Sequence, residues 1–264
     1  MGGAFTPTLG LLGKGRFSDG LAFSIPLLTI LGVHELGHWF MCRRYGVAAT
    51  LPYFIPFPPL PWFTVSGTLG AVIRVKEPIR KRRQLFDIGA SGPIAGFLAS
   101  LPFLIYGVSR ARVIPAAEQA AEGQTYFGYP ILVRLAQDLT DTARYTSRSV
   151  HEDPTFMAAW FGLLVTALNL MPIGQLDGGH VLRAAIGRRQ PIVSGIVLAA
   201  ALLLATVGGW AWAFFAALVA LFIGVPHPAA EDEDVPLDDG RQFLALLCVG
   251  IFLLCFSVTP IWQE

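Results

Sequence analysis

Charged residues are scarce in this sequence. Asp, Glu, Lys and Arg make up 14% of its 264 residues, whereas hydrophobic residues make up 54%. A soluble globular domain carries roughly 25% charged residues, so the composition excludes an ordinary soluble enzyme and indicates an integral membrane protein. Positive charge is not in excess either. The net charge is +1, which gives no reason to expect a nucleic-acid partner.

Cysteine and histidine are also rare, and this narrows the possible chemistry. The three cysteines, Cys42, Cys248 and Cys255, have no spacing typical of a metal site and form no disulfide framework. The five histidines are too few for a membrane enzyme that builds a di-iron centre from many histidines. A metal site in this chain must therefore use a small number of ligands.

Long apolar segments, in contrast, are abundant. A transmembrane helix needs about 20 consecutive apolar residues. Six segments are long enough, or nearly so, and the fourth and fifth should form a tight hairpin because only two glycines separate them. The segments lie at about 21–41, 86–108, 156–172, 191–208, 210–225 and 243–261. We therefore expect an all-α integral membrane protein with about six transmembrane helices, formed by residues 1–264 as a single domain.

The first apolar segment contains the motif His34-Glu35-Leu36-Gly37-His38. Residues four apart share one face of a helix, so the two histidines can bind the same metal ion. Glu35 can reach a metal-bound water without binding the metal, as the general base of a zinc hydrolase does. Because such groups are costly to bury at membrane depth, they indicate a functional metal site.

A catalytic zinc needs a third protein ligand and an open position for water. Asp177 is the best candidate, because it lies in a stretch with one proline and three glycines, residues 169–180, at the inner end of the third apolar segment. This run should break the helix at the depth of His34 and His38, and a helix break at that depth requires a buried polar setting. Asp87, beside four basic residues, is better explained as a charge at a helix N-terminus.

The basic residues predict how the chain crosses the membrane. Residues 42–85 contain eight Lys or Arg and one acid, and residues 183–190 contain three Arg. Both segments should therefore be cytoplasmic, with residues 1–20 and 109–153 outside. We expect the active site to open toward the cytoplasm.

Residues 51–75 fit neither a spanning helix nor a solvated loop. Five prolines exclude a helix, yet the segment is otherwise apolar and aromatic. We expect a re-entrant segment that includes a short strand or hairpin arm. The strand could accept an extended substrate peptide along its unpaired edge, or the segment could only seal the helix bundle. The residues expected to bind substrate are Gly67, Thr68, Leu69 and Gly70.

Together these motifs resemble a known family. An H-E-x-x-H motif in one span, followed by N-x-x-P-x-x-x-L-D-G at residues 169–178, is similar to the site-2 protease family of intramembrane zinc metalloproteases. The Gly-Pro-Ile-Ala-Gly run at 92–96 supports the resemblance, although we expect these small residues to serve helix packing. Residues 54–56 and 67–71 are similar to a subgroup found in bacteria and plastids, and the resemblance implies a location in the inner membrane of a bacterium. The resemblance covers about residues 20–190.

The resemblance implies roles for the site residues. One Zn²⁺ would be bound by His34, His38 and Asp177, and Glu35 would activate the attacking water. The substrate would be a membrane protein, cut in or near its transmembrane segment in regulated intramembrane proteolysis. Asn169 would contact the substrate backbone or stabilise the oxyanion, although a hydrogen bond between spans is the other explanation. The role of His180 stays open.

The resemblance also implies a domain organisation. A three-helix catalytic core at about 20–190 would be followed by C-terminal helices at about 191–264. Many relatives carry a PDZ or CBS domain, but the longest extramembrane stretches here, about 45 residues, are shorter than an ordinary domain. A separate membrane protein, or the loops themselves, would then present or regulate the substrate.

Two other classes of membrane protein fit the sequence less well. A metal-binding regulator or transporter that kept the fold would be favoured by the loss of Glu35 or Asp177, and both are present. A prenyl-protein endopeptidase would be expected to use a later glutamate on an apolar helix as its third ligand. No Glu follows Glu35 in any predicted span, which argues against that family.

Overall fold

The computed structural model describes residues 2–5, 17–56, 68–110, 112–113, 125–140, 150–151, 153–208, 210–224, 231–232 and 234–263. Most of these residues are helical, and each of the six predicted apolar segments largely coincides with a helix. The helices are α1 (Phe17–Arg44), α2 (Arg82–Ser109), α3 (Ile131–Leu139), α4 (Pro154–Asn169), α5 (Asp177–Ile186), α6 (Gln190–Gly208), α7 (Trp210–Leu218) and α8 (Asp239–Cys255), with a 3-10 turn η2 (Gly187–Arg189) and a π-helix η3 (Val219–Ile223).

Three helical stretches among the described residues are long and apolar enough to cross a membrane. They are Phe17–Arg44, Arg82–Ser109 and Asp177–Thr206, the last interrupted by η2. Helix α4 and the stretch Trp212–Leu221 are apolar but shorter. The chain is therefore a membrane protein by helix length and composition, and the expected number of about six crossings stays a prediction.

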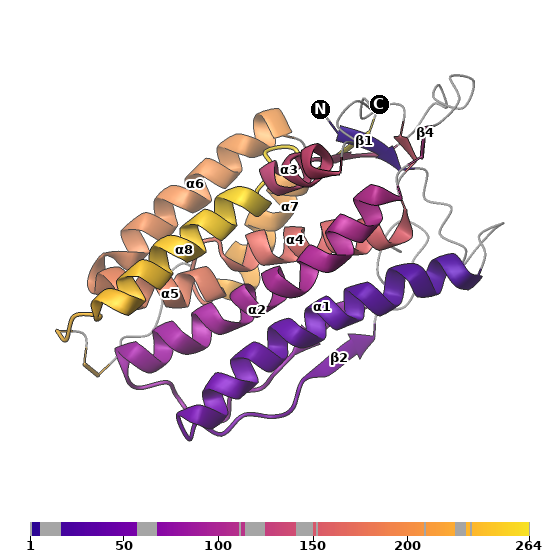
Figure 1. Ribbon diagram of the computed structural model, residues 1–264. Coiled ribbons are helices and arrows are strands. Elements are labelled where there is room, and N and C mark those ends of the chain that lie inside the picture. The colour runs from indigo at the N-terminus through magenta and orange to yellow at the C-terminus, as the bar shows by residue number, and fades with distance from the viewer. Residues whose placement is uncertain are drawn as a thin grey trace.

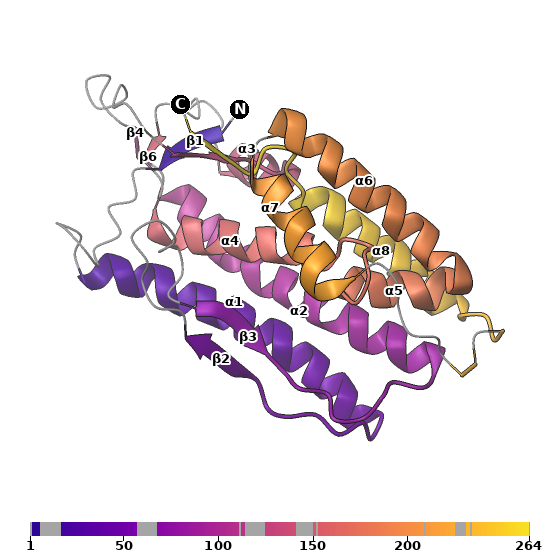
Figure 2. The ribbon, with the colours of Figure 1, turned by 180° about the vertical axis from the view of Figure 1, so that it is seen from behind.

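Helix α2 lies at the centre of the bundle and packs against α1, α4, α5 and α8 (Figures 1 and 2). The core between α2 and α4 contains several fully buried large side chains, among them Phe86, Leu104, Trp160 and Leu163. Helix α4 begins at Pro154, where the Asp153 carboxylate caps it by accepting the Thr155 N–H at 2.8 Å. Helices α1 and α4 also contact each other, so α1, α2 and α4 pack as a group of three.

The structure is mostly helical as expected, but it has more short strands than the one hairpin that the sequence predicted. Strands β1 (Gly2–Phe5), β5 (Thr125–Gly128) and β7 (Ile261–Gln263) form an antiparallel sheet in the order β1-β5-β7, which brings the two chain ends together (Figure 1). Strands β4 (Arg112–Val113) and β6 (Val150–His151) form a second antiparallel pair. Very short strands paired across distant segments leave no hydrophobic periodicity in the sequence.

The expected hairpin is present. Strands β2 (Tyr53–Pro56) and β3 (Thr68–Val72) pair antiparallel, and they lie beside α1 (Figure 2). Beyond the strands the two arms stay together, since the Lys76 N–H donates to the Ala48 carbonyl at 2.8 Å. The residues between the strands, 57–67, lie outside the described residues.

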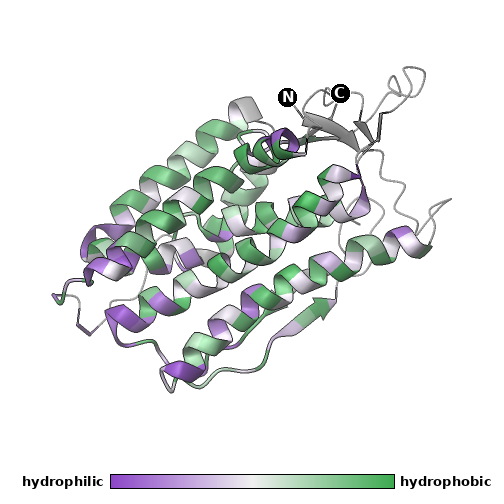
Figure 3. Cartoon of the chain, viewed as in Figure 1, coloured by the Kyte–Doolittle hydropathy of each residue, from purple (hydrophilic) through white to green (hydrophobic). Residues whose placement is uncertain are grey.

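Charged side chains gather at one end of the bundle, opposite the chain ends, where α1 finishes and α2 and α8 begin (Figure 3). Asp87 belongs to this charged end. Its carboxylate pairs with Arg241 of α8, whose Nη2 lies 2.6 Å from Oδ2, and it also accepts the Tyr45 hydroxyl. Asp87 is therefore not the simple N-terminal charge that the sequence suggested, but joins α1, α2 and α8.

Candidate metal centre

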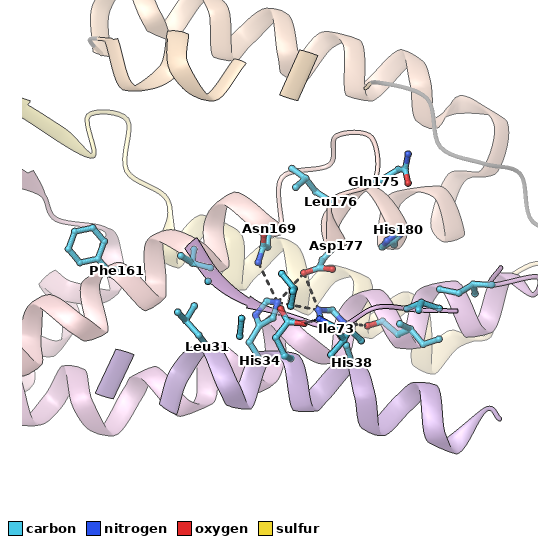
Figure 4. Close-up of a pocket in the computed structure, with 18 of the residues that line it drawn as sticks. Leu31, His34, His38, Ile73, Phe161, Asn169, Gln175, Leu176, Asp177 and His180 are labelled. Carbon is cyan, nitrogen blue, oxygen red and sulfur yellow. Dashed lines mark hydrogen bonds and ion pairs between the residues drawn. The ribbon is translucent and has the colours of Figure 1, made fainter. Parts of the chain in front are cut away.

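His34, His38 and Asp177 place three potential ligand atoms at one point inside the bundle (Figure 4). The two histidine Nε2 atoms are 3.2 Å apart. The Asp177 Oδ2 atom lies 3.2 Å from the first and 3.3 Å from the second. The histidines are 4% and 7% exposed. The structure thus brings the α1 motif and the helix break together inside the bundle, and the ligand roles expected of these residues stay a prediction.

This triangle fits a metal ion. Tetrahedral zinc, with bonds of about 2.0–2.2 Å, holds its ligand atoms roughly 3.3 Å apart. The three observed distances, 3.2 to 3.3 Å, match that spacing. Two neutral imidazoles and one carboxylate are also a donor set that zinc prefers. Glu35 lies in the same group, with its carboxylate within 4.8 Å of the histidine nitrogens.

Helix α2 orients the two histidine rings. The Nδ1 atom of His38 donates to the Ile88 carbonyl at 2.7 Å, so Nε2 keeps its lone pair for a metal. Gly92 and Gly96 lie directly beneath the rings. A Cβ on Gly92 would be 2.1 Å from the His38 Nε2 atom, and one on Gly96 would be 3.1 Å from the His34 Nδ1 atom. The small residues predicted to serve packing therefore pack against the candidate ligands themselves.

A compact turn carries Asp177 into the site. Helix α4 ends at Asn169, and Gly174 adopts a φ of +51° within the turn. Helix α5 then begins at Asp177, in a first turn where its negative charge is favoured by the helix dipole. Gly178 lets α5 fold back onto the turn, because a Cβ there would be 2.1 Å from the Leu170 carbonyl oxygen. The Pro–Gly pattern thus brings Asn169 and Asp177 to the same site.

The β2–β3 hairpin reaches the carboxylate of Glu35, the residue expected to act as general base. The Ile73 N–H, just after β3, donates to the Glu35 Oε2 atom at 3.1 Å (Figure 4). Phe54 of β2 lies against α1 at Gly32, where a Cβ would be 3.6 Å from the Phe54 ring. A backbone donor has no sequence signature, and neither do the Ile88 carbonyl and the contact at Gly92. These supports of the site could not be found from residue types alone.

The four residues expected to bind substrate lie only partly within the described residues. Gly70 lines the cavity at the metal centre and has a φ of +119°. Thr68 and Leu69 belong to β3, and Gly67 lies outside the described residues. Within the described chain, β3 pairs with β2 alone, so its other edge carries no strand.

The cavity extends from the metal centre along the hairpin. It has a volume of about 680 Å³, within the range of ligand-binding pockets. Its walls come from α1, β3, α4 and α5. Asn169 and His180 both line it, and the Asn169 Nδ2 atom is 3.4 Å from the His34 Nε2 atom. An apolar wall with a few convergent polar groups is typical of a substrate site.

Comparison with known proteins agrees with this geometry. The chain is 29% identical over 240 residues to "Probable zinc metalloprotease EGY2, chloroplastic" of Arabidopsis thaliana, which covers 89% of this chain and 41% of the relative. It is 28% identical over 241 residues to "Probable zinc metalloprotease EGY1, chloroplastic" of Oryza sativa subsp. japonica, covering 90% and 40%. It is also 28% identical over 262 residues to "Probable zinc metallopeptidase EGY3, chloroplastic" of Arabidopsis thaliana, covering 91% and 43%.

The chain therefore spans about two fifths of the length of these relatives. A match to a known family also contains the candidate site. Residues 22–208, which include most of α1, the hairpin, α2, α4, α5 and α6, match Peptidase family M50. The resemblance drawn from the motifs is confirmed, and the chain belongs to peptidase family M50, the family of the site-2 proteases.

Proposed function

We propose that this protein is an intramembrane zinc metalloprotease that hydrolyses a peptide bond in or near a transmembrane segment of another membrane protein. One observation carries this proposal: His34, His38 and Asp177 form a triangle of zinc-ligand size beside Glu35, on a helix long enough to span a membrane. The names of the relatives, zinc metalloproteases, support it.

In this proposal His34, His38 and Asp177 hold the zinc. Zinc, when bound, acts as a Lewis acid that acidifies a water molecule and polarises the scissile carbonyl. Glu35 takes the proton from that water and passes it to the leaving amine. The Ile73 N–H holds one Glu35 oxygen at the hairpin side of the cavity, which leaves the other oxygen for the water. His38 keeps its orientation through Ile88.

The hairpin is proposed to hold the substrate. A transmembrane substrate has its amides bonded within its own helix, so it must unwind locally before attack. The edge of β3 that faces the cavity offers backbone groups for such an extended peptide, with Gly67, Thr68, Leu69 and Gly70 as the contact residues. A hairpin that only seals the bundle is the alternative. A Gly70 variant would separate the two roles, because a shift in the position of the cut bond is expected only if the hairpin holds the substrate.

Asn169 is proposed to stabilise the oxyanion or bind the substrate backbone, since its amide nitrogen lies 3.4 Å from the His34 Nε2 atom. The same contact joins α4 to α1, so a hydrogen bond between spans is the alternative role. The remaining expectations rest on the charge pattern and the family. We propose a site open to the cytoplasm, a membrane-protein substrate, and a separate membrane protein that presents or regulates it. The relatives' names place them in chloroplasts, so the expected bacterial inner membrane stays a prediction.

Cleavage of a single-span reporter by the purified protein tests the proposal. We expect cleavage that stops when a chelator removes the metal and returns with one equivalent of Zn²⁺ but not with Mg²⁺. Mass spectrometry of the products should place the cut bond in or next to the reporter's transmembrane segment. Cleavage that persists in the chelated protein, or cuts confined to soluble tails far from the span, would contradict the proposal.

A further inference from the structure

Helix α6 contacts the turn that carries Asp177 through a buried pair of polar side chains. Gln190 and Ser194 are both 0% exposed. The Gln190 side-chain amide donates to the Ser194 hydroxyl at 2.8 Å, and that hydroxyl donates to the Pro172 carbonyl at 2.7 Å. Pro172 lies between Asn169 and Asp177, the two residues that the turn brings to the metal centre. The pair therefore joins α6 to the part of the chain that sets their separation.

Pro172 is the point of the turn that an outside donor can fix. The Ile173 N–H bonds to the Met171 carbonyl at 2.8 Å, which makes a tight turn around Pro172, and the Leu176 N–H bonds to the Ile173 carbonyl at 3.1 Å. The bonds of the turn thus use the carbonyls on either side of Pro172. The half-buried Pro172 carbonyl is thus left to a donor outside the turn, and its bond to the buried Ser194 hydroxyl fixes its position.

The direction of the Ser194 hydroxyl is unusual for a helix. A helical Ser or Thr commonly bonds to the carbonyl four residues earlier, as Ser100 does to Gly96 and Thr166 does to Gly162. Ser194 instead bonds across to another element. The Gln190 amide occupies the hydroxyl oxygen as an acceptor, so the hydroxyl hydrogen points at Pro172. Gln190 therefore selects the conformation in which Ser194 holds the turn.

We propose that Ser194, oriented by Gln190, is a positioning residue that sets the Asp177 carboxylate at the metal centre by anchoring the Pro172 carbonyl. Apolar packing strengthens the same connection, because Met171 and Ile173 are buried in one cluster with Ala201 of α6 and Trp212 of α7. The first of the C-terminal helices thus has a role in metal binding. This inference rests on the proposed assignment of Asp177 as a zinc ligand.

Zinc affinity, measured by chelator competition on the purified full chain, tests the inference. Mutation of a residue that orients a metal ligand, without binding the metal itself, typically lowers metal affinity about 10- to 100-fold. We expect Ser194→Ala to raise the zinc dissociation constant about tenfold, and Ser194→Thr, which keeps a hydroxyl, to restore most of it. Thr206→Ala is the matched control, because that hydroxyl on α6 bonds within its own helix, to the Leu203 carbonyl at 2.7 Å.

A second readout separates positioning from a general loss of stability. The visible spectrum of the Co²⁺-substituted protein reports ligand geometry, and it should change in Ser194→Ala but not in Thr206→Ala. If Ser194→Ala folds poorly, Gln190→Leu, which removes only the orienting amide, should give a smaller loss of zinc affinity. Wild-type zinc affinity and an unchanged Co²⁺ spectrum in Ser194→Ala would overturn the inference alone. A wild-type protein that binds no zinc would overturn the proposed function with it.

Discussion

The Glu35→Gln protein should bind one zinc per chain and cleave the single-span reporter at least about 100-fold more slowly than wild type. A general base contributes about 10²- to 10⁴-fold to the rate of such a reaction. Glutamine cannot accept the proton from water, yet its side-chain oxygen can still accept the Ile73 N–H. The hairpin should therefore stay in place, and the loss of rate reports the missing base.

The matched control is Glu77→Gln, the same chemical change at an exposed position outside the cavity. It should cleave within about twofold of wild type, since a single surface charge has little effect on a distant site. Zinc is quantified in both variants by elemental analysis. A Glu35→Gln protein that binds zinc and cleaves at the wild-type rate would remove Glu35 from the reaction.

The Gly92→Ala protein should lose zinc binding, although the change adds a single methyl group. That methyl carbon would lie 2.1 Å from the His38 Nε2 atom and 2.4 to 2.5 Å from two neighbouring ring carbons, so the imidazole must move. The Ile88 carbonyl holds the other side of the same ring, which leaves no relaxed position with Nε2 at the metal. We expect zinc affinity to fall by at least about 100-fold, the upper end of what ligand-orienting contacts contribute.

Gly250→Ala provides the control for Gly92→Ala. Gly250 lies in α8, and no atom within 4 Å would meet its added Cβ. In a helix interior, alanine is otherwise more favourable than glycine by about 1 kcal/mol, so this variant should fold and bind zinc as wild type does. The measurement is zinc per chain after dialysis against a weak chelator. Full zinc occupancy in Gly92→Ala would show that α2 does not restrict the His38 ring.

The metal centre could be predicted from sequence because its pattern is local. His34 and His38 are one helical turn apart, so their convergence follows from helix geometry alone. Asp177 is distant in sequence, but the Pro–Gly break and the apolar lengths placed it at the same membrane depth. The observed 3.2 and 3.3 Å distances to the two histidines agree with that argument.

The supports of the site could not be predicted in the same way, because they depend on backbone groups and tertiary packing. The site uses the backbone N–H of Ile73 and the backbone carbonyl of Ile88. Almost every residue carries these two groups whatever its side chain, so residue types do not reveal which ones bond to the site. In the sequence, Ser194 is one small residue within an apolar helix. Its bond to the Pro172 carbonyl is visible only in the folded structure. The ion pair of Asp87 could not be predicted for the same reason, since its partner Arg241 is 154 residues away.

X-ray absorption at the zinc edge of the purified wild-type protein would test the central claim most directly. The account predicts one zinc per chain, with a first shell of two imidazole nitrogens and oxygen ligands at about 2.0–2.2 Å and no sulfur. In Asp177→Ala the shell should lose one protein oxygen while both imidazoles remain. Absence of stoichiometric zinc, or a sulfur ligand at about 2.3 Å, would contradict the assignment of His34, His38 and Asp177.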